Sequence, residues 1–250
     1  MCATSRGGNG NVCRPGARQK ESAFGGGAHY TASVAIGWHI AVAVAGYLIG
    51  SIPTGYLVAR SRGVDIRKVG SGNIGATNVL RSLGKPAGIL VLALDALKGA
   101  LACWLLPLAA EACAGAGAEP HVETLRILAG IAAILGHNYT CWLRFKGGKG
   151  IATSAGVLVV WMPTALGLAL AVWVLVFVVS GYVSLASILA AFALPFIVWL
   201  TGSSATLIVV AAVLGGLAIY RHRSNIKRLR DGTEHRFRRA RAGGSPSPEI

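Results

Sequence analysis

Long apolar runs alternate with short polar segments along this chain. The first run covers about residues 34–58, the second about 87–110 and the third about 125–143. Each run is close to or above the ~20 residues that a helix needs to cross a hydrocarbon core of ~30 Å, so we expect three transmembrane helices here. Residues 1–33 show no apolar period and are predicted to form a disordered extension.

The stretch from Ile151 to Tyr220 is apolar and holds no Asp, Glu, Lys or Arg in its 70 residues. Two crossings of ~35 residues each would be too long for a bilayer, whereas four of ~17 residues each are short but feasible. Helix-breaking sequences at residues 163–164, 180–181 and 201–204 divide the stretch into four parts. The pattern predicts four helices in this stretch and seven in the chain.

The charged residues lie between the apolar runs and predict an orientation. Residues 59–86 carry six basic side chains against the single acid Asp65. Residues 144–150 are also basic, and the tail from Arg221 carries nine basic and three acidic side chains. Residues 111–124 carry three Glu and neither Lys nor Arg. Because Lys and Arg mark cytoplasmic loops, we expect the three basic segments on the cytoplasmic side.

Together these features predict an all-α polytopic membrane protein with seven transmembrane helices, its N-terminus outside and its C-terminus cytoplasmic. The membrane domain is expected to span residues 34–221. Residues 222–250 are expected to form a basic cytoplasmic tail whose distal part is disordered. Four basic side chains within residues 1–33 oppose this orientation, but three basic segments outweigh one.

Composition narrows the classes of partner. The chain is 54% hydrophobic and 13% charged, with a mean hydropathy of +0.59 and a formal net charge of +15. A nucleic-acid-binding domain would gather its cations on one folded face with aromatic residues among them. Here the cations lie in short blocks between apolar runs, so no nucleic acid partner is expected. The five cysteines include no CxxC pair, and no metal site is predicted.

A polar loop of small residues interrupts the apolar pattern at residues 71–78, Ser-Gly-Asn-Ile-Gly-Ala-Thr-Asn. Its glycines let backbone N–H groups approach an anion closely. Four cations flank it: Arg67, Lys68, Arg81 and Lys85. A membrane helix bundle has no packing reason to keep such a loop, so we interpret it as a phosphate-binding loop.

Further polar motifs lie at the ends of later apolar runs. Phe145-Lys-Gly-Gly-Lys-Gly150 lacks the spacing of a nucleotide-binding P-loop, yet glycines beside a lysine at a helix start suit a phosphate. Gly136–Tyr139 is polar, Ser180–Ser187 is rich in hydroxyls, and His222 and Asn225 lie one helical turn apart. Taken singly, these motifs also fit interfacial anchors, helix contacts or a basic segment that binds anionic lipid.

Taken together, the motifs resemble those of the bacterial acyl-phosphate:glycerol-3-phosphate acyltransferase family, the PlsY type. The resemblance covers about residues 45–235 and departs from the family at Ile74, where many members have Pro. Three regions carry it: Gly50–Gly55 with Ser71–Arg81, Gly136–Tyr139 with Phe145–Thr153, and Arg221–Leu229 with Gly232–Glu234. Three motifs in the same order, separated by the expected spans, make a specific signal.

The resemblance implies an enzyme that moves a fatty acyl group from acyl phosphate to the 1-hydroxyl of glycerol 3-phosphate, giving lysophosphatidic acid and inorganic phosphate. It implies an integral protein of the bacterial cytoplasmic (inner) membrane with its active site facing the cytoplasm. Acyl phosphate, glycerol 3-phosphate and membrane lipid are the implied partners, and no cofactor is implied. The His-x4-Asp pair of other acyltransferases is absent, since no histidine has Asp five positions on.

The site residues follow from the family's motifs. The implied catalytic residues are Ser71, Arg81, Lys149 and His222. The implied substrate-binding residues are Gly72, Asn73, Thr77, Asn78, Gly147, Gly148, Ser187 and Asn225, and Glu234 is expected to hold the tail in place. Arg81 and Lys149 would neutralise phosphates, and backbone amides near Gly72 and Gly148 would cradle them. His222 is expected to bind substrate rather than to act as an obligatory base, and Ser187 is preferred to Ser184 as a ligand contact.

Two other functions fit parts of the pattern. A transporter or channel for a phosphorylated solute would explain the loop cations. It would also explain Asp95 and Lys98, which lie three residues apart inside the second run and can neutralise each other. It does not explain why the candidate ligands gather at one surface rather than at the bilayer midplane. A scaffold that recruits partners through its basic tail leaves the Gly-rich loops unexplained.

The predicted orientation can be tested with a reporter that is active only in the cytoplasm. Seven crossings with a cytoplasmic tail place the N-terminus outside. The reporter should therefore be inactive when fused to the N-terminus and active when fused to the C-terminus. Activity at both ends would contradict seven crossings.

Overall fold

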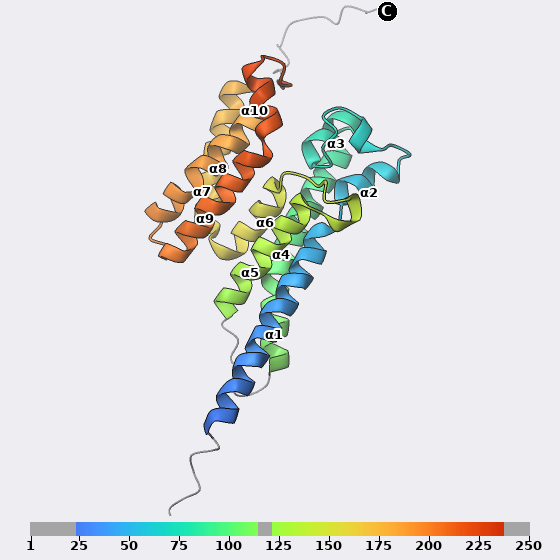
Figure 1. Ribbon diagram of the computed structural model, residues 1–250. Helices are drawn as coiled ribbons and strands as arrows, with labels where there is room; N and C mark the ends of the chain where they lie inside the picture. The colour runs from blue at the N-terminus through green and yellow to red at the C-terminus, as the bar shows by residue number, and fades with distance from the viewer. Residues whose placement is uncertain (1–23, 115–121, 238–250) are drawn as a thin grey trace, which may run out of the picture.

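The computed structural model describes residues 24–114 and 122–237, and every regular element in these two ranges is a helix (Figure 1). The α-helices are α1 (Phe24–Ser51), α2 (Thr54–Arg60), α3 (Ala76–Leu83), α4 (Lys85–Ala114), α5 (Val122–Asn138), α6 (Ile151–Trp161), α7 (Pro163–Ser180), α8 (Val183–Leu200), α9 (Ala205–Arg221) and α10 (Arg223–Arg230). Two short 3₁₀ turns, η1 (Ile66–Lys68) and η2 (Cys141–Leu143), lie in the loops after α2 and α5. The prediction of an all-helical chain is confirmed for the described residues.

The first apolar run is broken near its C-terminal end. Pro53 separates α1 from α2, because proline has no N–H to donate within a helix and its ring clashes with the preceding turn. α1 begins at Phe24, earlier than the apolar pattern predicts. Residues 24–33 are therefore helical, although the sequence placed them in a disordered extension, and residues 1–23 lie outside the described range.

The uncharged stretch divides into four helices at the predicted breakers. α6 and α7 meet at Met162, and Gly181 separates α7 from α8 in a left-handed conformation with φ of 73°. Residues 201–204 separate α8 from α9. The helix breaks were predictable because Pro, Gly and clustered hydroxyl residues end helices for local reasons.

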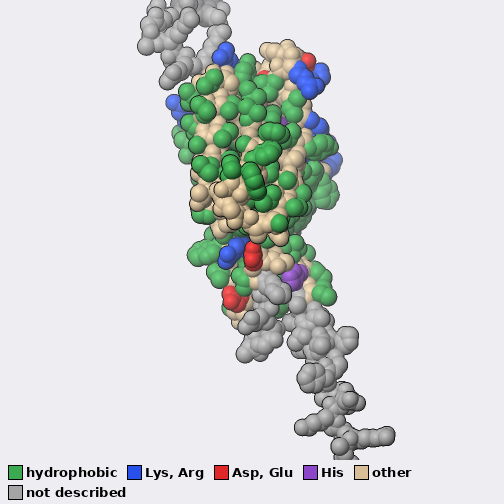
Figure 2. All heavy atoms as spheres, turned by 90° about the vertical axis from the view of Figure 1, so that its left-hand side faces the viewer, with side chains coloured by type: hydrophobic (Ala, Val, Ile, Leu, Met, Phe, Trp, Pro, Cys, Tyr) green, Lys and Arg blue, Asp and Glu red, His purple; other side chains and the backbone are tan. Residues whose placement is uncertain are grey.

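Four described helical segments are long and apolar enough to cross a membrane: Ile36–Arg60, Lys85–Ala114, Pro163–Ser180 and Val183–Leu200. The pair of α9 and α10, which bends by 55°, is a fifth candidate. α5 and α6 are shorter, at 17 and 11 residues. Figure 2 shows hydrophobic side chains over the middle of the face it views, with most of the visible Lys and Arg near its upper end. Such a surface is typical of an integral membrane protein.

The helices form two groups that meet at α6. In the first group α1 packs on α5, and α4 packs on α1, α5 and α6; in the second, α8 packs on α7 and α9. Leu158 of α6 and the adjoining Met162 belong to an apolar cluster with Val198 and Ala211 of the second group. α3 and α10 lie at the same end of the molecule (Figure 1), so the loops that carry the sequence motifs gather there.

A buried ionic cluster joins helices of the first group. Asp95 and Lys98 of α4 form the expected ion pair at 2.8 Å, with side chains 2% and 6% exposed. The Lys98 ammonium also donates to the Ile52 carbonyl at 2.8 Å and lies 3.0 Å from His137 Nδ1 of α5. The Thr54 hydroxyl donates to Asp95. Because both charges have polar partners, the cluster can persist in the interior and fixes α2, α4 and α5 relative to one another.

The close approach of α4 and α6 depends on Gly156. A Cβ at this position would collide with the backbone carbonyl oxygen of Ala96. We expect Gly156→Ala to lower the free energy of unfolding by about 1–3 kcal/mol, seen as a lower thermal midpoint in detergent. The matched control is Gly167→Ala in α7, where nothing lies within 4 Å, and its midpoint should be unchanged or slightly raised. Equal midpoints for the two variants would contradict this packing.

Candidate active site

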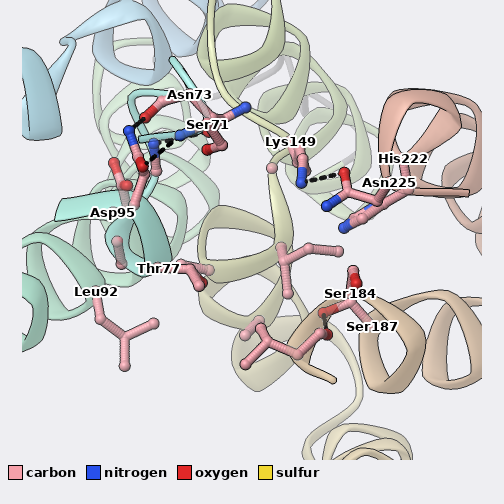
Figure 3. A pocket seen from close by; sticks show the side chains of 18 of the residues that line it. Ser71, Asn73, Thr77, Leu92, Asp95, Lys149, Ser184, Ser187, His222 and Asn225 are labelled. Atoms are coloured by element: carbon pink, nitrogen blue, oxygen red, sulfur yellow. Dashed lines mark hydrogen bonds between the residues drawn. The ribbon is translucent and has the colours of Figure 1, made fainter. Parts of the chain in front are cut away.

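A cavity of about 290 Å³ lies between the two helix groups, at the end of the molecule that holds α3 and α10. It brings together polar residues that are far apart in the chain (Figure 3). Its lining includes Ser71, Asn73, Thr77, Asn78, Arg81, Asp95, His137, Lys149, Ser184, Ser187, His222, Asn225 and Glu234. Among the residues predicted for the site, three glycines lie outside this lining: Gly72, Gly147 and Gly148.

Three helices begin at this cavity. The first-turn residues that line it are Ala76 and Thr77 of α3, Ile151 and Ala152 of α6, and Val183 and Ser184 of α8. None of these three helices has an N-cap side chain that accepts a hydrogen bond from its first turn. The first N–H groups of a helix have no intrahelical partner and carry partial positive charge. The cavity therefore suits an anion such as phosphate even before any charged side chain is considered.

The side chain of Asn78 holds the first polar loop in shape. Its amide nitrogen donates to the carbonyls of Ile66, Val69 and Asn73 at 3.3, 3.0 and 2.9 Å. Its oxygen accepts from the N–H of Ser71 at 2.9 Å. These bonds occupy both amide donors. We therefore assign Asn78 to loop geometry, which differs from the substrate contact expected from the sequence.

The Gly-rich loop before α6 is held through its backbone. The N–H groups of Gly147 and Gly148 donate to the carbonyls of Asn138 and His137 at 3.2 and 3.0 Å. From the other helix group, Arg221 donates to the carbonyls of Gly147 and Gly148 at 3.1 and 2.7 Å. A Cβ on Gly148 would collide with the His137 ring, which explains a glycine there. The role of these glycines in this structure is close packing, not the cradle of amides expected from the sequence.

The amides of the cavity come from helix starts rather than from the predicted glycines. The N–H of Gly72 donates to the carbonyl of Val69 at 3.1 Å and so belongs to a turn. Gly150, which does line the cavity, precedes α6 with φ of 81° and turns the chain into the helix. The amides available to an anion are therefore those at the start of α6, about one turn after the glycines predicted from the sequence.

Lys149 joins the two helix groups through hydrogen bonds. Its ammonium donates to Asn225 Oδ1 at 2.5 Å, and the Asn225 amide donates to Glu234 Oε1 at 2.7 Å. Glu234 also accepts from Ser184 at 2.8 Å and from Arg228 at 2.6 Å. The Glu234 carboxylate is therefore satisfied by α8 and α10, and its hydrogen bonds connect the tail to the site.

The two cations of the cavity, Arg81 and Lys149, form no ion pair with a carboxylate in the described part of the chain. Burial lowers the pKa of Lys149 from 10.5 to about 8, and the positive charges of Arg228 and Arg81 act in the same direction. Burial is also the main cause that lowers the pKa of Arg81, although an arginine stays charged. An anion between the two would offset both the burial and the repulsion.

His222 lies at the bend between α9 and α10 as a neutral ring. Its Nδ1 is 2.8 Å from the Ala218 carbonyl, so Nδ1 carries the hydrogen and Nε2 is left as an acceptor. Burial, followed by the nearby charge of Lys149, lowers the pKa of His222 to about 4. Such a ring suits the role of hydrogen-bond acceptor for a hydroxyl better than that of a strong base.

One side of the cavity is apolar and continues into a second hollow of about 90 Å³. Leu170, Trp173 and Ser187 line both spaces, and the rest of the second lining is almost entirely apolar. The Trp173 indole donates to Ser187 Oγ at 3.1 Å, and Ser187 donates to the Val183 carbonyl at 2.8 Å. A polar, cationic space beside an apolar one suits a ligand with an anionic head and a hydrocarbon chain.

Comparison with known proteins identifies the family. The family model for glycerol-3-phosphate acyltransferase matches residues 40–232. A glycerol-3-phosphate acyltransferase from Geotalea daltonii is 46% identical over 203 residues, which cover 80% of this chain and 98% of the relative. One from Moorella thermoacetica, glycerol-3-phosphate acyltransferase 2, is 48% identical over 201 residues, which cover 80% and 97%. The chain belongs to the glycerol-3-phosphate acyltransferase family.

Solved structures of this family agree with the assignment. A crystal structure of PlsY, an integral membrane glycerol 3-phosphate acyltransferase, in its glycerol 3-phosphate form is 41% identical, with a TM-score of 0.71. It matches 80% of this chain and 95% of its own. The lysophosphatidic acid form is 40% identical, with a TM-score of 0.69. The resemblance inferred from the motifs is confirmed.

The cavity of this acyltransferase includes residues beyond those predicted for the site. Asp95 and His137 reach the wall from the buried ionic cluster, and Trp173 reaches it from α7. Asp95 carried a signal, because an ionisable residue inside an apolar run marks a candidate functional site. Trp173 carried none, since an aromatic residue in such a run is common. Within residues 24–114 and 122–237, no group of three or more His, Cys, Asp or Glu is placed to hold a metal ion.

The lowered pKa of Lys149 predicts how anion binding depends on pH. Below about 8 the side chain is charged and attracts a phosphate, and above about 8 it becomes neutral. Glycerol 3-phosphate is a dianion well above a pKa of about 6, so its own charge is constant in this range. Its affinity, measured by calorimetry in detergent, should therefore fall as the pH rises from about 7 to about 9.5.

The control for this pH dependence is Lys149→Arg, because arginine stays charged throughout the range. We expect this variant to bind glycerol 3-phosphate with an affinity that does not change with pH. A wild-type affinity that is equally constant would show that the charge of Lys149 does not contribute to binding.

Proposed function

We propose that this protein transfers a fatty acyl group from acyl phosphate to the 1-hydroxyl of glycerol 3-phosphate, producing lysophosphatidic acid and inorganic phosphate for phospholipid synthesis. One observation carries the proposal. Arg81, Lys149 and the starts of three helices meet at one cavity that adjoins an apolar hollow. Both substrates carry a phosphate, and the donor also carries a long acyl chain. Membership of the glycerol-3-phosphate acyltransferase family supports the same activity.

The reaction needs positioning and charge more than a reactive side chain. An acyl phosphate is a mixed anhydride, so its phosphate is already a good leaving group. The 1-hydroxyl oxygen forms an ester bond to the acyl carbon, and the bond from that carbon to the phosphate oxygen breaks. The hydroxyl proton ends on the released phosphate. Because no covalent enzyme intermediate is required, holding the two substrates together can supply most of the rate.

The main obstacle is the repulsion between two phosphate groups. Arg81 and Lys149 contribute two positive charges, and the starts of α3, α6 and α8 add partial positive charge. The two acids of the lining do not cancel this charge, since Asp95 is paired with Lys98 and Glu234 with Arg228. We therefore assign the phosphates to the space between Arg81 and Lys149. The remaining polar residues of α3 and its preceding loop bind phosphate or glycerol oxygens: Ser71, Asn73 and Thr77.

The acceptor hydroxyl and the acyl chain take the other sides of the cavity. His222 Nε2 accepts a hydrogen bond from the attacking hydroxyl and orients it, while a pKa of about 4 keeps this ring from taking the proton outright. Asn225 holds Lys149 beside it. Ser187 lies where the polar and apolar spaces meet, so it marks the place of the acyl carbon, although its hydroxyl already bonds to Val183 and Trp173. The apolar hollow then takes the first part of the chain.

The membrane arrangement is part of the proposal. Seven segments cross the bacterial inner membrane: α1 with α2, and then α4, α5, α6, α7, α8 and α9. The N-terminus lies outside, the C-terminus lies in the cytoplasm, and the cavity faces the cytoplasm. The positive-inside tendency supports this orientation, because the basic segments that contain Arg81, Lys149 and Arg221 all contribute to one end of the molecule.

The function can be tested with detergent-purified protein supplied with palmitoyl phosphate and glycerol 3-phosphate. We expect lysophosphatidic acid and inorganic phosphate in equal amounts, whereas a transporter would form neither. Arg81→Ala should lower turnover by at least about 100-fold, because it removes a charged donor from the phosphate site. Arg60→Ala, on the exposed end of α2, is the matched control and should retain activity. Wild-type protein that forms no product would contradict the function, and full activity in Arg81→Ala would exclude Arg81 from the site.

A further inference from the structure

Arg81 lies against an aromatic ring, although the site contains a carboxylate. Its guanidinium carbon is 5.0 Å from the centroid of the Phe237 ring, over the ring face. Its Nε is buried without a hydrogen-bond partner, and within the described residues its side chain makes no ion pair. The negative charge of Glu234 partly opposes the lowering of the Arg81 pKa by burial. The Glu234 carboxylate accepts its hydrogen bonds from residues of α8 and α10 instead.

Phe237 lies at the end of a short segment after α10, residues 234–237, which we call the strap. The N–H of Phe237 donates to the Gly181 carbonyl at 2.9 Å, in the turn between α7 and α8. Its ring meets the Phe177 ring edge-on, with centroids 6.0 Å apart and an angle of 71° between the planes. These two contacts hold the ring in place independently of the first helix group.

Two more contacts fix the strap along its length. Glu234 is 7% exposed and anchors the start of the strap. Arg236 Nε donates to the Ser180 carbonyl at 2.9 Å. Gly181 allows the strap to pack this closely, because a Cβ there would lie 2.9 Å from the Phe237 carbonyl oxygen and 3.0 Å from Arg236 Cγ. The strap is therefore a rigid part of the second helix group.

A ring serves an anion-binding arginine better than a carboxylate does. An unrestrained arginine loses side-chain entropy when it is fixed on a ligand. A carboxylate would fix Arg81 in advance but would occupy its N–H donors and cancel its charge. The face of a phenyl ring attracts the cation and leaves the N–H groups at the edge of the guanidinium free for a phosphate.

We propose that Phe237 is a positioning residue for Arg81. The strap brings a ring from the second helix group to α3, and the ring holds the guanidinium in the orientation that a substrate phosphate requires. This inference rests on the proposed acyl transfer, in which Arg81 binds phosphate. In this proposal the strap supports the active site. Phe237 itself lies outside the sequence motifs and does not line the cavity.

The inference can be tested with variants that keep or remove the ring. Phe237→Leu keeps an apolar side chain without a ring face, and Phe237→Tyr keeps the ring. With palmitoyl phosphate and glycerol 3-phosphate, we expect Phe237→Leu to lower kcat/KM by about 3- to 30-fold, mainly through a higher KM. Phe237→Tyr should stay within about 2-fold of wild type. Phe192→Leu removes an exposed ring that contacts Phe196 in α8 and should have no effect.

A double-mutant cycle separates positioning from a general packing role. An Arg81→Lys background lacks the planar guanidinium that stacks on the ring. In this background Phe237→Leu should lower kcat/KM by a clearly smaller factor than in wild type. An equal loss in both backgrounds would show that the ring acts on the fold and would overturn the inference. Wild-type kinetics in Phe237→Leu would overturn it as well. If wild-type protein itself transfers no acyl group, the proposed function fails instead, so the two failures are distinguishable.

Discussion

The cavity holds two partly buried cations, Arg81 and Lys149, at one end of an apolar molecule. They must be held together despite their repulsion, and without a carboxylate partner that would neutralise them. Arg81 and Lys149 both have a pKa lowered by burial, and three helix starts add partial charge beside them. The neighbours that hold these cations are uncharged: the amide of Asn225 for Lys149 and the ring of Phe237 for Arg81. The acids of the lining are paired with other cations, so the charge of the cavity remains available to a phosphate.

The frame around this charge is built from two helix groups, and each supplies polar residues to the cavity lining. The Gly-rich loop illustrates the construction, because its N–H groups bond to the end of α5 while its carbonyls accept from Arg221 at the end of α9. Behind the loop, the ionic cluster of Asp95, Lys98 and His137 fixes α4 against α5. A site assembled from two bodies needs such supports, since small displacements of a charged donor are costly to catalysis.

The sequence predicted the all-helical class, the division of the uncharged stretch into four helices and the family, because apolar runs, helix breakers and short motifs are local signals. It also predicted which segments meet, since Arg81, Lys149 and His222 line one cavity. It did not predict how single residues are used. Gly148 contributes packing rather than an amide, because its N–H reaches a carbonyl of α5. The contact between Phe237 and Arg81 could not be predicted either. The two residues are more than 150 positions apart, so their contact depends on tertiary packing alone.

The central claim is that one cavity holds two phosphate-bearing ligands at the same time. The most direct measurement is calorimetric titration of purified protein with glycerol 3-phosphate, with and without a saturating, non-reactive alkyl phosphonate analogue of acyl phosphate. The account predicts that glycerol 3-phosphate still binds, with one molecule per protein chain, when the analogue is present. Mutual exclusion of the two ligands would contradict it.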